Sequence, residues 1–164
     1  MSAAAVTPAS VIPAEAMLSH WQGHRRLTRN LIEAFPEDQL FTFSVGGMRP
    51  FGVIVMELIS MAGPMARGIA SDTWETLPPH DTSTPLPKAE VLRLWDEQTS
   101  LIEEWWPRIP VGRFLEKMTA FGTYPGVGHD LLLYVIDNEV HHRGQGYVYL
   151  RSLGITPPMF WERC

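Results

Sequence analysis

The alternation of apolar and polar positions along the chain predicts four long amphipathic helices. Apolar residues recur at steps of three and four within residues 14–35, 50–70, 89–106 and 128–153, a spacing that gathers them on one helix face. Pro36 and Pro107 should end the first and third helices, and Pro64 should kink or break the second. Residues 71–88 contain four prolines and little periodicity, and a connection this long can carry the chain along a domain. The pattern predicts an all-α antiparallel four-helix bundle with a crossover between the second and third helices.

Composition narrows the class of protein. The chain has 164 residues, 45% hydrophobic and 19% charged, which suits one domain over 1–164, with the Ala-, Ser- and Pro-rich residues 1–12 as a loose N-terminal arm. A net charge of -5 argues against a nucleic-acid partner, because phosphate binding relies on clustered Lys and Arg. No apolar run reaches about 18 residues, so no membrane span is expected. The only cysteine, Cys164, has no partner within the chain, and the start does not resemble a signal peptide, so we expect a cytoplasmic protein.

The last predicted helix carries polar residues on the face that should be buried. At about 100° per residue, one stripe is apolar at its start and polar in its middle; it consists of Leu131, Val135, Asn138, His142, Gln145 and Tyr149. Asp137 and His141 form a second four-residue pair nearer the helix flank. A histidine four residues after another N or O donor is a spacing that metal sites use. This face is therefore the first candidate site.

Glu57 is the candidate partner of this stripe. It is the only charged residue in the run VIVMELISMAG, residues 53–63, and an ionised carboxylate among apolar side chains needs a compensating cation, proton or set of donors. A metal between Glu57 and His142, with Asn138 as a third ligand or a supporting donor, would satisfy these groups. A salt bridge from Glu57 to His142 or to Arg143 would do so equally.

At these residues the chain resembles the DinB/YfiT-like superfamily of four-helix-bundle proteins. The resemblance lies in HRRLTRNLIEAFPEDQLFTFSVGGMRPFG (24–52), HHRGQGYVYLRSLGI (141–155) and PPMFWER (157–163). It implies an up-down-down-up bundle with its long connection between the second and third helices, a frequent homodimer and, in many members, a divalent metal held by three histidines.

Carried onto this sequence, the three metal positions are Glu57, Asn138 and His142, and only His142 keeps the family's residue. Glu is a good oxygen ligand and Asn a weak neutral one, so this set should bind zinc or nickel less tightly than three imidazoles and should favour a harder ion or an empty site. His141 is a second-choice ligand. Gln145 and Tyr149 would shape the surroundings of the site.

The resemblance implies two kinds of function. A metal with open coordination positions acidifies bound water or thiol, which suits a metal-dependent thiol transferase or hydrolase acting on a small molecule. The alternative is a non-enzymatic stress-response or small-molecule-binding bundle, in which Glu57 and His142 form a structural pair and no metal binds.

Other candidates are weaker. His20 and His24 lie four residues apart on the first predicted helix, which the neighbouring Arg25 suggests is largely exposed, so we expect no ligand role for them. His80 is expected to be a solvated residue of the Pro-rich connection. Trp74, in the same connection, could line a small-molecule pocket.

Overall fold

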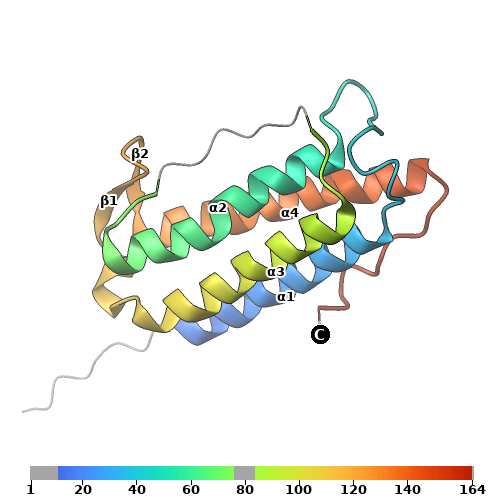
Figure 1. The fold of residues 1–164 in the computed structure, drawn as a ribbon. Coiled ribbons are helices and arrows are strands. Elements are labelled where there is room, and N and C mark those ends of the chain that lie inside the picture. The colour runs from blue at the N-terminus through green and yellow to red at the C-terminus, as the bar shows by residue number, and fades with distance from the viewer. Residues whose placement is uncertain (1–10, 76–83, 164) are drawn as a thin grey trace, which may run out of the picture.

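Four long helices run along one axis in the computed structural model, which describes residues 11–75 and 84–163 (Figure 1). They are α1 (Ala14–Ala34), α2 (Phe51–Ser71), α3 (Lys88–Trp105) and α4 (Gly128–Ser152). α1 and α4 start at the end of the bundle that carries a small hairpin, whereas α2 and α3 finish there (Figure 1). This is the predicted up-down-down-up order. The expected N-terminal arm, the middle of the crossover with His80, and Cys164 lie largely or wholly outside the described residues.

Each helix packs against two others. α2 contacts α3 and α4, and α1 contacts the same two helices from the opposite corner. α4 therefore presents one face to α2, another to α1 and a third to solvent. This arrangement places the candidate residues of α2 and α4 at one shared interface.

Prolines set the starts of the first three helices. Pro13, Pro50 and Pro87 each directly precede a helix, where a fixed φ favours entry and the missing N–H costs nothing. Pro64 also lies within α2. α2 continues as one helix to Ser71, so Pro64 does not break it; that Pro64 kinks the helix stays a prediction.

The segment after α3 contains elements that the periodicity did not predict. Short 3-10 turns at Trp106–Arg108 and Val111–Phe114 lead into an antiparallel hairpin of β1 (Lys117–Ala120) and β2 (Tyr124–Val127). The hairpin turn holds Phe121 and Gly122 at positive φ, 53° and 69°. The Phe121 ring lies 5.5 Å from that of Trp74, centroid to centroid, so Trp74 packs against the hairpin.

The hydrophobic core has two clusters separated by a polar layer. One cluster fills the hairpin end, around residues such as Trp21, Ile102 and Leu132, and the other fills the opposite end, around Phe51 and Trp95. Between them lie buried polar side chains from α1 and α4. The middle of the bundle is therefore where the chain concentrates its buried charge.

α2 is the most apolar helix of the described chain. By length and composition alone it could cross a membrane, but 56% of its most apolar window is buried inside the bundle. A core helix packed between two neighbours has the same composition.

Candidate functional site

Glu57 of α2 meets Asn138 and His142 of α4, as the sequence analysis predicted. Asn138 Nδ2 donates to Glu57 Oε1 at 3.3 Å, and His142 Nε2 lies 3.5 Å from the same oxygen. The His142 side chain is buried, and that of Glu57 is 32% exposed. The facing midpoints of two antiparallel helices thus produce the predicted contact.

Arg49 completes this group, and the sequence analysis missed it. Its Nη1 lies 2.5 Å from Glu57 Oε2. Arg49 stands just before α2 and eight residues from Glu57, so the three- and four-residue rule for helical pairs does not connect them. We call Arg49, Glu57, Asn138 and His142 the Glu57 cluster.

Neighbouring side chains orient the Glu57 cluster. Gln145 Oε1 lies 2.9 Å from His142 Nδ1, and Gln145 Nε2 lies 3.4 Å from His141 Nε2. His141 itself is exposed. The buried Tyr149 donates its hydroxyl to the backbone oxygen of Arg49 at 2.9 Å, which holds the Arg49 segment against α4. Gln145 thus contacts the Glu57 cluster through His142, and Tyr149 contacts it through the backbone of Arg49.

The cluster keeps Glu57 ionised. Burial by itself would raise the pKa of Glu57, but hydrogen bonds from Arg49 and Asn138 and the charge of Arg49 outweigh it and leave the pKa below its ordinary value. Each of these partners stabilises the carboxylate form. The carboxylate thus already has a cation and two further neighbours.

These residues do not fit the three-histidine metal site that the resemblance implies. Glu57 is bound to a guanidinium, and Asn138 turns an N–H donor, not its oxygen, toward the carboxylate. Within residues 11–75 and 84–163, no group of three or more His, Cys, Asp or Glu side chains is placed to hold a metal ion. Only His142 offers the expected imidazole.

A second polar group lies deeper, between α4, α1 and α3. Glu139 Oε1 accepts a 2.6 Å hydrogen bond from Thr28 Oγ1, and its carboxylate lies 3.7 Å from Arg25 Nη1 and 3.9 Å from Arg143 Nη1. The three charged side chains are 1–7% exposed. Arg143 thus pairs with Glu139, not with Glu57. We call Arg25, Thr28, Glu139 and Arg143, together with His24, the Glu139 cluster.

The sequence did not predict the burial of these charged side chains. Glu139 and Arg143 lie four residues apart, a spacing typical of exposed helix pairs, and Arg25 suggested a largely exposed first helix. That expectation is wrong at this position: the Arg25 guanidinium lies 3.5 Å from the centre of the Trp95 ring and donates to Trp95 O at 2.8 Å. The aromatic partner comes from α3, seventy residues away.

Burial governs the ionisation of the Glu139 cluster. It raises the pKa of Glu139, against the opposing effects of Arg25, Thr28 and Arg143, and lowers that of Arg25 to about 10.

His24 is also buried, and it accepts a hydrogen bond from Arg143 at Nδ1. Burial, followed by the charges of Arg143, Arg163 and His20, lowers the pKa of His24 to about 3. Its Nε2 lies 3.1 Å from that of the exposed His20. Because Nδ1 accepts, Nε2 must carry the proton of the neutral ring, so His24 has no lone pair left for a metal.

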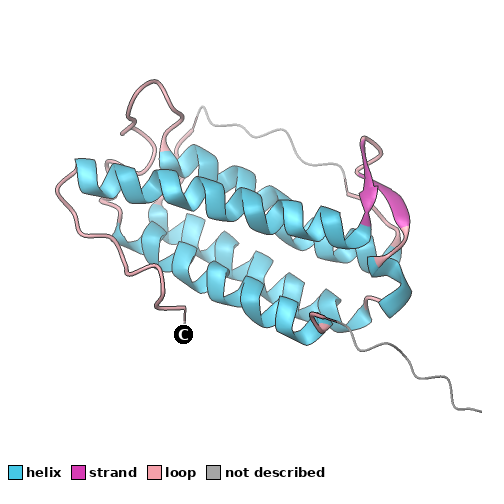
Figure 2. Cartoon of the chain, turned by 180° about the vertical axis from the view of Figure 1, so that it is seen from behind, coloured by secondary structure: helices cyan, strands magenta, loops and turns pink. Residues whose placement is uncertain are grey.

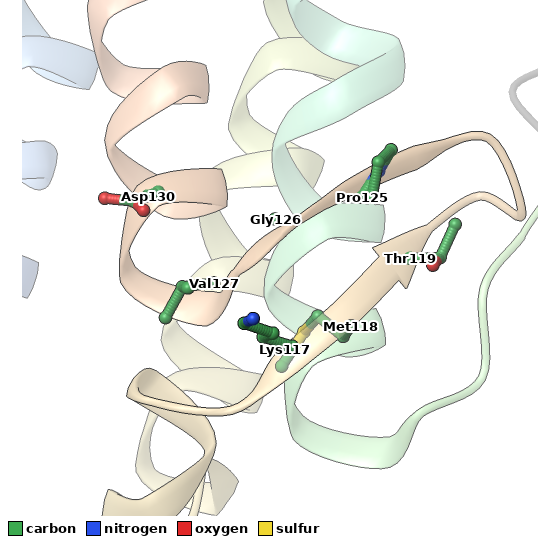
Figure 3. A pocket seen from close by; sticks show the side chains of 7 residues that line it. All are labelled: Lys117, Met118, Thr119, Pro125, Gly126, Val127 and Asp130. Atoms are coloured by element: carbon green, nitrogen blue, oxygen red, sulfur yellow. The ribbon is translucent and has the colours of Figure 1, made fainter.

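Two described cavities lie away from both clusters. One of about 440 Å³ opens beside the hairpin and is lined by β1, β2 and Asp130 at the start of α4 (Figure 3). Another of about 260 Å³ lies just beyond the end of α4, between Arg151 and Met159. Neither is lined by Glu57, Asn138 or His142.

Comparisons with known proteins agree with this architecture. The DinB family model matches residues 6–163. An uncharacterised Bacillus subtilis protein, YjoA, is 22% identical over 147 residues, which cover 90% of this chain and 95% of that protein.

Two solved structures share the fold. The crystal structure of the DinB-like protein YjoA from Bacillus subtilis superposes with a TM-score of 0.68 at 21% identity, covering 90% of this chain and 99% of that one. A DinB-like protein from Bacillus cereus gives a TM-score of 0.68 at 19% identity, over 88% and 95% of the two chains. With a family model that spans nearly the whole sequence, the chain belongs to the DinB family.

Proposed function

We propose that this chain is a metal-independent, non-enzymatic member of the DinB family, in which the Glu57 cluster joins α2 to α4. The observation that carries the proposal is the 2.5 Å contact between Arg49 Nη1 and Glu57 Oε2. Arg49 supplies the positive charge that a metal ion would otherwise bring to this carboxylate. A divalent ion placed here would have to displace the guanidinium or bind beside it.

The remaining donors support the same conclusion. Asn138 donates an N–H to Glu57 at the position where an imidazole could bind an ion. His142 Nε2 lies 3.5 Å from Glu57 Oε1. Polar groups placed between two helices can fix the register of one helix against the other, which is the best attested use of such groups.

A metal-dependent thiol transferase or hydrolase is the competing function. It requires Arg49, half of whose side chain is exposed, to leave Glu57, and Asn138 to turn its amide oxygen toward the ion. The spacing of 3.3 and 3.5 Å around Glu57 Oε1 is short enough for one ion to bridge the three side chains after those changes. The two functions therefore differ in whether the native donor set binds an ion tightly.

Metal titration of the full chain, purified without an affinity tag and stripped with a chelator, separates them. We expect the wild type to bind Zn²⁺ or Ni²⁺ no more tightly than its His142→Ala variant. The combined variant Arg49→Ala, Glu57→His, Asn138→His rebuilds three imidazoles and should bind about one ion tightly, since three histidines form a well-known zinc ligand set. Adding His142→Ala to that variant should abolish the gain.

Tight metal binding by the wild type would support the competing function. One tightly bound ion per wild-type chain, lost in both Glu57→Gln and His142→Ala, would refute the proposal and make the metal-dependent enzyme the working hypothesis. Thiol-transfer and hydrolysis assays on the loaded protein would then follow.

A further inference from the structure

Two N–H donors of α1 are buried without an acceptor. Trp21 and Arg25 lie four residues apart, so their side chains project from the same side of the helix. The two residues are 0% and 1% exposed. Within the described part of the chain, neither Trp21 Nε1 nor Arg25 Nη1 has a hydrogen-bond partner. Such a pair requires an explanation, because buried polar groups nearly always have a partner and an unmade hydrogen bond is costly.

Both donors lie beside the carboxylate of Glu139, which α4 brings to α1 where the two helices lie side by side (Figure 2). Arg25 Nη1 is 3.7 Å from Glu139 Oε2, whereas a hydrogen bond between charged groups is about 2.7–2.9 Å long. Burial raises the pKa of Glu139, and the indole N–H of Trp21 is among the groups that oppose this effect, which places it next to the carboxylate. Two donors and one acceptor thus face one another without direct hydrogen bonds.

Other contacts hold the guanidinium and the carboxylate at this distance. Arg25 Nε donates to Thr99 Oγ1 at 3.0 Å, and Arg25 Nη2 donates to Trp95 O at 2.8 Å. On the opposite side, Glu139 Oε1 accepts the hydroxyl of Thr28 at 2.6 Å. A shift of either group that closed the 3.7 Å gap would lengthen these bonds. The gap is therefore a product of how α1, α3 and α4 pack together.

Water is the ligand whose hydrogen bonds match these three atoms. Its oxygen can accept one hydrogen bond from Arg25 Nη1 and one from Trp21 Nε1, while one of its protons is donated to Glu139 Oε2. Buried waters typically make about three such bonds, and a water often lies between polar atoms more than about 3.5 Å apart. A cation would face the guanidinium and an anion would face the carboxylate, so neither kind of ion suits all three atoms.

We propose that α1 and α4 enclose a binding site for one structural water, held by Trp21 Nε1, Arg25 Nη1 and Glu139 Oε2. The water supplies the hydrogen bonds that the two buried donors lack, and it joins the guanidinium to the carboxylate across the gap between them. None of its three partners belongs to the Glu57 cluster, so this site and the metal-independent role of that cluster stand or fall separately.

A high-resolution crystal structure of the full wild-type chain tests the site. We expect one ordered oxygen at about 2.7–3.2 Å from each of the three named atoms. A second crystal soaked in bromide separates water from an anion, because bromide scatters anomalously and water does not. An anomalous peak at this position would overturn the proposal. So would a structure with no ordered oxygen there, in which Trp21 Nε1 or Arg25 Nη1 donates directly to Glu139 or keeps no partner.

A matched pair of variants tests the part of Trp21. Trp21→Phe keeps an aromatic ring but removes the N–H, so the occupancy of the water should fall at least twofold in the crystal. Trp106→Phe is the control, because Trp106 is also buried, at 4% exposure, but donates its indole N–H directly to Ala14 O at 3.1 Å. That variant should keep the water unchanged. An equal occupancy in wild type and Trp21→Phe would remove Trp21 from the site and overturn the proposal as stated. If Trp21→Phe does not fold, the wild-type crystals decide alone.

Discussion

The two carboxylates at the middle of the bundle should respond very differently to the same chemical change. Glu139→Gln removes the negative charge between Arg25 and Arg143, whose side chains are 1% and 7% exposed. Glu57→Gln removes the charge beside Arg49, which is 50% exposed. Both substitutions keep nearly the same side-chain shape, so the comparison isolates the cost of uncompensated charge in a buried and in a half-exposed position.

The expected magnitudes follow from burial. Taking away one partner of a buried ion pair costs about 3–5 kcal/mol, since the remaining charge has no access to water. An exposed pair contributes about 1 kcal/mol or less, because solvent screens the guanidinium. For a chain of this length, about 2–4 °C of melting temperature corresponds to each kcal/mol. Glu139→Gln should therefore lower the melting temperature by about 6–20 °C, and Glu57→Gln by no more than about 4 °C.

Urea unfolding followed by circular dichroism gives the free energies directly, at a protein concentration low enough to keep every variant in one association state. The slope of free energy against urea must agree among the variants for the comparison to hold. A Glu139→Gln variant within about 1 kcal/mol of Glu57→Gln would refute the reasoning, because the buried guanidiniums would then not depend on Glu139 for their compensation.

Two further predictions concern packing and pH. Gly146→Ala should destabilise the fold by about 1–3 kcal/mol, because a Cβ at this position overpacks against Phe51 and Leu31. The matched Gly144→Ala, whose Cβ would meet nothing within 4 Å, should be neutral or slightly stabilising. Urea unfolding of the two variants would contradict the packing argument if Gly146→Ala is the more stable. His24 has a pKa of about 3 in the folded chain and close to 6.5 when unfolded, so only the unfolded chain takes up its proton between these values. The free energy of unfolding should therefore decrease as pH falls from 6.5 toward 3, by at most about 1.4 kcal/mol per unit. The difference between wild type and His24→Gln, measured from pH 7 to 4.5, isolates this dependence because the shared carboxylates largely cancel, and a difference independent of pH would show that His24 does not titrate as described.

Some of the candidate site could be predicted from sequence because its residues obey helical spacing. Asn138 and His142 lie four apart, so they had to share a face, and Glu57 stood out as a lone charge in an apolar helix. The structure places all three within contact distance. Their use as metal ligands stays a prediction that the contact with Arg49 weakens.

Arg49 could not be found in this way, since no spacing rule relates a residue before a helix to one two turns inside it. The position of Arg49 depends on Tyr149, which holds its backbone oxygen from the far end of α4. The same limit hid the Glu139 cluster, because a Glu and an Arg four residues apart look the same on a buried helix face as on an exposed one.

The sequence by itself determined the four helices, their order and the crossover, because each depends on local periodicity, on prolines and on the length of a connection. Only the tertiary structure decided which charges were buried and with whom they paired. The stripe of α4 that contains Asn138 and His142 faces α2, whereas Glu139 and Arg143 face α1. This division exists only because both neighbouring helices are in place. Burial is a property of three helices packed together, and the pattern of a single helix does not contain it.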